Sequence, residues 1–180
     1  SNCGSVDAFL GWGLKQGGFY KDYARALIDS GEINSDGFIA KWQELGTLDA
    51  VGFEKMQHDY IKSAYYDVAC EYLKQNMFNV EKHSNALKDV VWSRAVQYGT
   101  GEIVNMFNDA LKLMEKALDI ELPNLSYIDD KRFDYDLIAG IYDTCMSLEW
   151  NSSVLRESLN NRFADEKFKA LKMLMEEGEG

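Results

Sequence analysis

Residues 84–99 read SNALKDVVWSRAVQYG, and this stretch decides the fold. Ser84 can cap a helix and Gly99 can end one, so the stretch predicts a helix over residues 84–98. A helix that is apolar nearly all round is typical of one that is buried on several sides. We therefore predict that this helix runs through the middle of the protein. Counted at 100° per residue from Leu87, apolar side chains cover most of its circumference, namely Val90, Val91, Trp92, Ala95 and Val96.

A narrow polar stripe remains on this helix, formed by Asp89, Ser93 and Gln97 at intervals of four residues. Buried polar groups need hydrogen-bond partners. The stripe therefore either bonds internally and holds neighbouring helices in register, or lines a cleft. The positions four and eight residues after Asp89 are neutral, so the local spacing offers no second carboxylate to raise the pKa of Asp89.

Helical periodicity continues on both sides of the stretch, and glycine, asparagine and a Ser-Asp pair punctuate it. No alternating pattern typical of a strand stands out, so we predict an all-α protein, an irregular multi-helix globule rather than a regular bundle. One domain is expected over residues 1–177, with a frayed tail at 178–180. Ser5 is the predicted cap of the first helix, residues 34–36 offer caps for a third helix that extends through Leu45, and residues 119–132 are predicted to form a loop. The other predicted helices cover residues 6–15, 19–30, 49–64, 65–75, 102–118, 133–148 and 153–176.

Charge and composition exclude several classes of function. The 180 residues carry 19 Lys and Arg against 30 Asp and Glu, a net charge of −11, and no basic run that could contact nucleic-acid phosphates. No stretch of 18 apolar residues predicts a membrane span. The three cysteines and two histidines lack metal-ligand spacing, so neither a metal nor another cofactor is expected. The first residue is serine rather than methionine, and we expect a processed or truncated chain.

Further polar and aromatic side chains stand out on the predicted helices over residues 49–64 and 84–98. Gln57 falls within the apolar arc of the 49–64 helix, where its amide either ties helices together or faces a groove. Tyr60 and Tyr98 belong to a dense set of aromatic rings that either fill the core or stack on sugars in a cleft. Arg162 and Glu166 have the spacing of a surface salt bridge.

Two runs resemble a known family: FEKMQHDYIKSAYYDVA over residues 53–69 and ALKDVVWSRAVQYGTG over residues 86–101. The family is that of the chitosanase-like and lysozyme-like glycoside hydrolases, in the branch of phage- or tail-associated cell-wall hydrolases. The ends SNCGSVDAFLGW (1–12) and NNRFADEKFKALKML (160–174) are similar as well, so the resemblance spans nearly the whole chain. The matching positions are Gln57, His58 and Ile61 in the first run and Asp89, Trp92, Ser93, Ala95, Val96, Gln97 and Gly99 in the second, while Tyr98 replaces the family's histidine.

The resemblance implies a two-lobed helical glycosidase acting on a β-1,4-linked amino-sugar polymer, peptidoglycan in preference to chitosan. In the family the general-acid glutamate precedes the segment that matches residues 1–12, and a second carboxylate completes the pair that this chemistry needs. We therefore expect no catalytic residue in this chain, which would need an N-terminal companion segment to act. An extracellular or phage-tail location is favoured over the cytoplasm. The substrate-binding residues would be Gln57, Tyr60, Asp89, Ser93, Gln97 and Tyr98.

Two other functions stay open. One is a non-catalytic helical binding or assembly module of a phage tail or secretion apparatus, which fits the missing acid. The net charge of −11 fits it too, because it would repel anionic wall polymers, although it would attract polycationic chitosan. The other is an unrelated intracellular helical protein.

Overall fold

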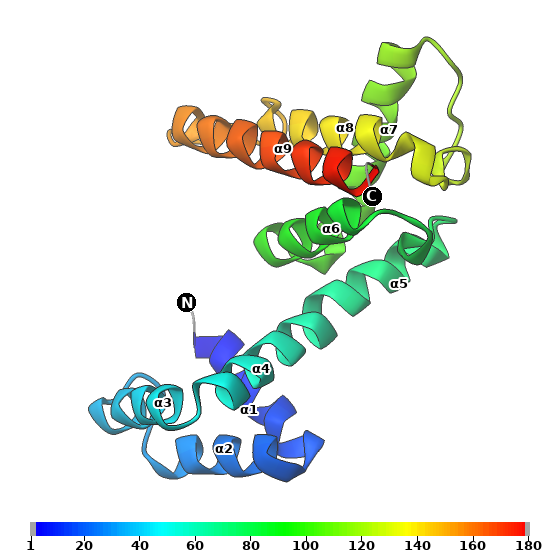
Figure 1. The fold of residues 1–180 in the computed structure, drawn as a ribbon. Coiled ribbons are helices and arrows are strands. Elements are labelled where there is room, and N and C mark those ends of the chain that lie inside the picture. The colour runs from blue at the N-terminus through cyan, green and yellow to red at the C-terminus, as the bar shows by residue number, and fades with distance from the viewer. Residues whose placement is uncertain (1–2, 179–180) are drawn as a thin grey trace. The chain divides into compact units, whose positions relative to one another are not determined.

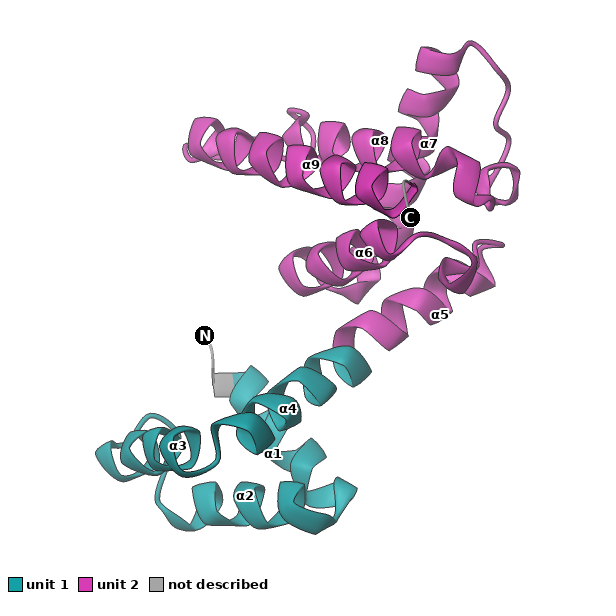
Figure 2. Cartoon of the chain, in the orientation of Figure 1, with its two compact units in different colours: residues 1–64 teal, residues 65–180 magenta. Residues whose placement is uncertain are grey.

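The computed structural model describes residues 3–178, which are largely helical and contain no β-strand, so the all-α prediction is confirmed (Figure 1). The chain divides into two compact units, residues 1–64 and 65–180 (Figure 2). The single domain over 1–177 stays a prediction, because compactness alone does not show whether the units fold separately. Of the predicted tail, Gly178 ends the last helix, and residues 179–180 lie outside the described residues. None of the described helices is long and apolar enough to cross a membrane.

In the described part of the first unit, four helices pack so that each contacts its neighbour in sequence and α1 also contacts α4. Ser35, one of the three predicted cap candidates, caps α3, because its side chain accepts a hydrogen bond from the amide of Phe38. Asp49, predicted as the first residue of the next helix, caps α4 by accepting a hydrogen bond from the amide of Gly52. Its helices are α1 (Cys3–Gln16), α2 (Gly18–Asp29), α3 (Asp36–Leu48) and α4 (Ala50–Ile61). Its buried core consists of Phe9, Leu10, Ala24, Leu27, Phe38, Leu45, Phe53 and Met56.

Two predicted helix boundaries are wrong in this part of the chain. The first helix already includes Cys3, so Ser5 lies within it and does not cap it. The predicted break between residues 64 and 65 is absent, because α4 passes into a π-helical turn, Lys62–Tyr66, and then into α5, Asp67–Gln75. The polar and aromatic residues of this turn carry no sequence signal that predicts a π-helix.

The second unit is built around α6 (Asn85–Tyr98), which contacts α5, α7, α8 and α9. This confirms the predicted central helix. The other long helices are α7 (Ile103–Leu118), α8 (Asp134–Met146) and α9 (Arg156–Gly178), and α8 contacts both of its neighbours in sequence. The stretch predicted as a loop over 119–132 contains the short 3-10 turn Leu125–Ile128 and the start of a second, Lys131–Phe133.

Side-chain hydrogen bonds cap the N-terminus of α6, and a glycine with a positive φ ends the helix. The Ser84 hydroxyl accepts a hydrogen bond from the amide of Leu87 at 3.1 Å, and Gly99 ends the helix with a φ of 87° that favours glycine. The carboxylate of Glu177, at the far end of α9, accepts hydrogen bonds from the amides of Asn85 at 2.8 Å and Ala86 at 2.9 Å. A carboxylate at a helix N-terminus also interacts favourably with the helix dipole. The last helix therefore caps the central one.

A buried imidazole joins the start of α6 to the start of α8. The ring of His83 lies between two carboxylates, with Nδ1 2.6 Å from Asp134 Oδ1 and Nε2 2.8 Å from Asp129 Oδ1. The second oxygen of Asp134 accepts a hydrogen bond from the amide of Ser84 at 2.8 Å. Phe78 stacks on the imidazole with ring centroids 4.3 Å apart. These contacts bring together segments about fifty residues apart in the sequence.

Candidate functional site

The site is organised by a charged side chain inside the second unit. Arg94, on α6, is 1% exposed and is the largest fully buried side chain of the described residues. Its guanidinium lies over the rings of Tyr142, Phe163 and Tyr98, with centroids 5.1, 5.3 and 5.7 Å away. Aromatic faces attract a cation, and the attraction grows when water is excluded. The surrounding rings therefore offset part of the cost of burying this charge.

The guanidinium donates its hydrogen bonds to protein atoms. One nitrogen lies 2.8 Å from a carboxylate oxygen of Glu166 on α9, and the same nitrogen contacts the side-chain oxygens of Ser93 and Gln97 at 3.1 Å. Arg162 Nε lies 3.1 Å from the other carboxylate oxygen of Glu166, so the predicted pair of Arg162 and Glu166 is confirmed. Glu166 thus bridges two arginines and joins α9 to α6.

Beside this network lies a groove of about 360 Å³ between α6, α8 and α9. Asp89, Ser93, Glu166 and Lys169 supply its polar side chains. The remaining lining residues are mostly apolar: Ala86, Val90, Tyr142, Ala170 and Met173. A mostly apolar concavity with a few polar groups at its edge is the usual form of a ligand site.

Asp89 lines this groove, and the pKa of its carboxyl is raised. Burial of the carboxylate is the larger cause, and the negative charge of Glu177 is the second. The expectation that no second carboxylate raises the pKa of Asp89 is therefore wrong. That expectation rested on positions of the same helix, whereas Glu177 belongs to α9.

The structure places the polar stripe of α6 partly in the groove and partly in the arginine network. Asp89 and Ser93 line the groove, and Gln97 does not. Ser93 and Gln97 both accept hydrogen bonds from Arg94, and Gln97 also contacts Arg162. Both readings of the stripe are thus realised, at different positions along it.

Tyr98 belongs to the aromatic surroundings of Arg94 and not to the groove lining. Its ring meets Trp150 edge-on with centroids 5.7 Å apart. Burial, followed by the neighbouring Cys145 thiol, raises the pKa of Tyr98. The hydroxyl therefore stays protonated at neutral pH.

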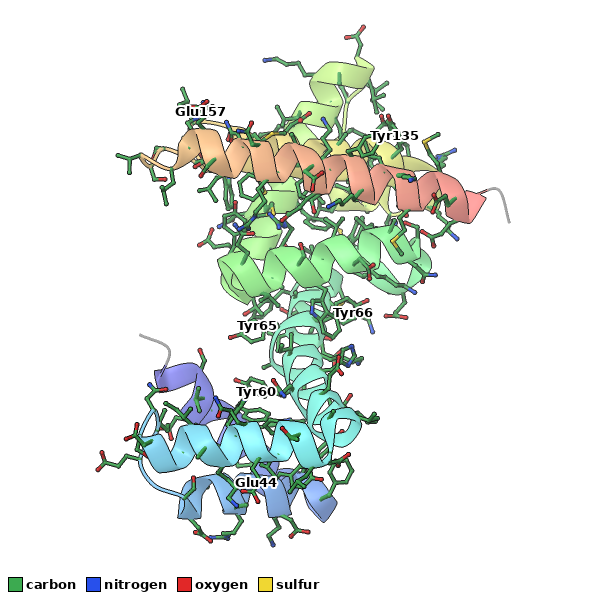
Figure 3. All side chains as sticks on the ribbon, turned by 60° about the vertical axis from the view of Figure 1, so that its left-hand side comes forward. Glu44, Tyr60, Tyr65, Tyr66, Tyr135 and Glu157 are labelled. Carbon is green, nitrogen blue, oxygen red and sulfur yellow. The ribbon has the colours of Figure 1, made fainter. Side chains whose placement is uncertain are left out.

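Gln57 and Tyr60 belong to the first unit, whereas the other four predicted residues belong to the second. Tyr60 is labelled in Figure 3. Gln57 is half-buried, and its amide nitrogen donates a hydrogen bond to the carbonyl of Phe53 at 3.2 Å. Tyr60 packs against Phe9 and Trp12, with ring centroids 5.3 and 5.6 Å away. A role in ligand binding stays a prediction for all six residues.

Sequence reasoning missed Arg94 as the centre of the site, although a signal was present. Arg94 lies seven residues after Leu87 and four after Val90, so it falls on the apolar face of the helix. A charged residue in that position must find a partner when it is buried. The sequence predicted Glu166 only as the partner of Arg162 in a surface salt bridge, and not as the partner of Arg94. Within residues 3–178, no group of three His, Cys, Asp or Glu side chains is arranged to hold a metal ion.

Comparison with known proteins identifies the family. Residues 1–167 match the family model described as type VI secretion system spike protein VgrG3-like, C-terminal. The type VI secretion system spike protein VgrG3 of Vibrio cholerae serotype O1 is 27% identical over 110 residues, which is 60% of this chain. The matched region is 10% of that protein's length.

These matches correct the assignment to chitosanase-like and lysozyme-like glycoside hydrolases, because both name a secretion spike protein. Glycoside hydrolysis and action on peptidoglycan are withdrawn with that assignment. The residues that carried the resemblance have packing roles here: Trp92 lies against Tyr66 with ring centroids 5.4 Å apart, and Ser93 and Gln97 hold Arg94. Such a pattern specifies how helices pack and does not by itself carry a reaction. The chain belongs to the family of VgrG3-like C-terminal regions of type VI secretion system spike proteins.

Proposed function

We propose that this chain is a non-catalytic helical module carried by a type VI spike, and that it leaves the cytoplasm with that spike. Its groove between α6, α8 and α9 would hold a segment of a partner protein during assembly of the apparatus. The observation that carries this proposal is the groove itself, with its mostly apolar lining and its few polar side chains.

The Arg94 network supports a groove of fixed shape. Glu166, which lines the groove, is bound by Arg94 from α6 and by Arg162 from its own helix. These contacts hold two walls of the groove together before any ligand arrives. A site that is already ordered loses less conformational entropy on binding. The proposed partner would thus meet a rigid surface.

The polar groups of the groove are arranged for binding more than for proton transfer. The two carboxylate oxygens of Glu166 already contact nitrogens of Arg94 and Arg162. Lys169 pairs with Asp165 at 2.8 Å along the same helix. Asp89 makes no ion pair with the described residues and is free to select a cationic group on the ligand.

A cationic polysaccharide such as chitosan is the second candidate ligand of the same groove. Asp89 favours it, together with the net charge of −11, because both attract a polycation. Binding would again occur without turnover.

The experiment fills the groove in a full-length spike. Ala170 lines the groove, so Ala170→Trp blocks it, while Ala164→Trp places the same ring at an exposed position of α9 that does not line the groove. We expect Ala170→Trp to lower the amount of exported spike at least tenfold, and Ala164→Trp to change it less than twofold. Circular dichroism of both purified variants checks that the helices remain.

Three outcomes decide the proposal. Loss of export with Ala170→Trp alone supports it, and equal export from both variants overturns it. Calorimetry with chitosan oligosaccharides tests the second candidate: binding that Asp89→Asn abolishes supports a glycan ligand. Turnover of those oligosaccharides by the purified chain would overturn the non-catalytic assignment.

A further inference from the structure

The second unit has a second concave surface, between α7 and the connection from α8 to α9. It consists of two neighbouring cavities of about 500 and 230 Å³. Both are lined by Asp109, Lys112, Glu149 and Trp150. No residue of the groove at Asp89 lines either of them. The larger cavity adds Glu102, Asn105 and Asn108, and the smaller adds Leu113, Thr144 and Ser147.

The surface is acidic. Glu102, Asp109 and Glu149 face a single cation, Lys112, whose side chain is 78% exposed and lies 3.7 Å from Asp109. Glu102 and Glu149 form no ion pair with the residues that the structure describes. Carboxylates gathered on a concave surface raise the local concentration of cations and of cationic ligands.

One buried hydroxyl in the wall of the smaller cavity has no partner. Thr144 is 2% exposed, and its Oγ1 makes no hydrogen bond within residues 3–178. An unsatisfied buried polar atom destabilises a protein, and native proteins rarely leave one in place. A ligand that donates a hydrogen bond to Thr144 would remove this destabilisation. The hydroxyl therefore points to a ligand independently of the acidic residues.

The aromatic ring between the two cavities is held in place. The indole nitrogen of Trp150 donates a hydrogen bond to Asp109 at 2.8 Å, and the ring meets Tyr98 edge-on. Its orientation is thus set from two sides. The face of a tryptophan ring is the best aromatic partner for a cation. Leu113, beside it, is 40% exposed and offers an apolar contact.

We propose that this surface, lined by Glu102, Asp109, Glu149, Trp150 and Thr144, binds a basic peptide segment of a partner protein. An arginine or lysine side chain enters beside Trp150 and meets the carboxylates. An apolar neighbour in the peptide covers Leu113, and a peptide N–H donates to Thr144. Charge complementarity selects the occupant, because the surface has three carboxylates against one ammonium group. This inference rests on residues outside the groove and is independent of the proposed function.

The test measures fluorescence anisotropy of a labelled hexapeptide of alternating arginine and leucine with the full chain of 180 residues. A peptide of alternating glutamate and leucine is the matched probe. We expect binding of the basic peptide alone. Glu102→Gln with Glu149→Gln should weaken it at least tenfold, and Lys112→Ala should strengthen it two- to fivefold. The control is Glu32→Gln with Glu54→Gln, two exposed residues of the first unit, which changes the total charge equally and should alter affinity less than twofold.

Thr144→Val separates a specific site from general attraction between charges. Valine matches threonine in shape and removes the unpartnered hydroxyl, so the variant should fold at least as stably while its affinity for the basic peptide falls several-fold. Equal loss of affinity in the Glu32 and Glu54 control would overturn the proposal. So would binding of free arginine amide as tight as that of the peptide, or failure of Thr144→Val to change affinity.

Discussion

The guanidinium of Arg94 lies 2.8 Å from the carboxylate of Glu166, joining α6 to α9 across 72 residues of sequence. The two partners are buried to different extents, since the Arg94 side chain is 1% exposed and the Glu166 side chain is 30% exposed. This asymmetry gives the first prediction.

Removing Glu166 should destabilise the protein more than removing Arg94. Glu166→Ala leaves a buried guanidinium without its carboxylate, and breaking a buried pair in this way costs about 3–5 kcal/mol of unfolding free energy. Arg94→Met leaves a partly exposed carboxylate that still pairs with Arg162. Urea unfolding followed by circular dichroism measures both. Arg162→Ala, at the exposed end of the network, should cost less than about 1 kcal/mol. The reverse order of the two main variants would contradict a buried charge at Arg94.

His83 should make stability fall as pH rises. Burial opposes the charged imidazolium, but hydrogen bonds to Asp134 and Asp129 outweigh it and raise the pKa of His83 above 6.5. The folded state then binds a proton more tightly than the unfolded state. The resulting stability is fully present below pH 6.5 and is lost as pH increases through the raised pKa. Unfolding free energies measured between pH 5 and 9 should show this fall, and His83→Gln should flatten it. His58→Gln, on an exposed part of α4, should leave the slope as it is.

Gly140 should tolerate no larger side chain, because α7 and α8 approach closely there. A Cβ atom at Gly140 would lie 3.1 Å from the carbonyl oxygen of Ala110 and 3.4 Å from its Cβ. Overpacking of this kind costs about 1–3 kcal/mol, so Gly140→Val should lower the denaturation midpoint. Gly11→Ala is the control, since nothing lies within 4 Å of a Cβ atom at that position in α1. It should stabilise the protein by up to about 1 kcal/mol through helix propensity. A neutral Gly140→Val would show that the helices can separate at little cost.

Glu177 should protect the first turn of α6 from local opening. Its carboxylate accepts the amide hydrogens of Asn85 and Ala86. Glu177→Ala removes charge-assisted hydrogen bonds at a helix N-terminus, which contribute about 1–2 kcal/mol. Hydrogen exchange should then be faster at these two amides, with little change in α7. The adjacent Glu176→Ala, which is exposed, serves as control. Unchanged amide hydrogen exchange in Glu177→Ala would mean that the Ser84 cap alone protects the first turn of α6.

Local signals in the sequence predicted the helices well. Ser84 and Ser35 cap helices where their side chains suggested, and Gly99 ends α6 with a positive φ. Caps act through hydrogen bonds between residues two or three apart, so they are legible without the fold. The π-helical turn at 62–66 was not predicted, because no such short-range signal marks it.

The site was predicted only in part, because its partners come from distant segments. The polar stripe of α6 directed attention to Asp89 and Ser93, and both line the groove. The charge that organises the site, Arg94, was overlooked because it interrupts an apolar face. The resemblance drawn from the same helix led to the wrong family, since similar packing patterns occur in proteins that do different things.

The amino-acid sequence by itself determined that this protein is helical, where most of its helices begin and end, and that α6 is buried on several sides. Helical periodicity and capping depend on neighbours within one or two turns, and these are fixed by sequence order. Only the tertiary structure decided which charges meet. Glu166 and Glu177 reach α6 from α9, and Asp129 and Asp134 enclose His83 from about fifty residues away. The energy of such contacts depends on burial and distance, which exist only once the helices have packed.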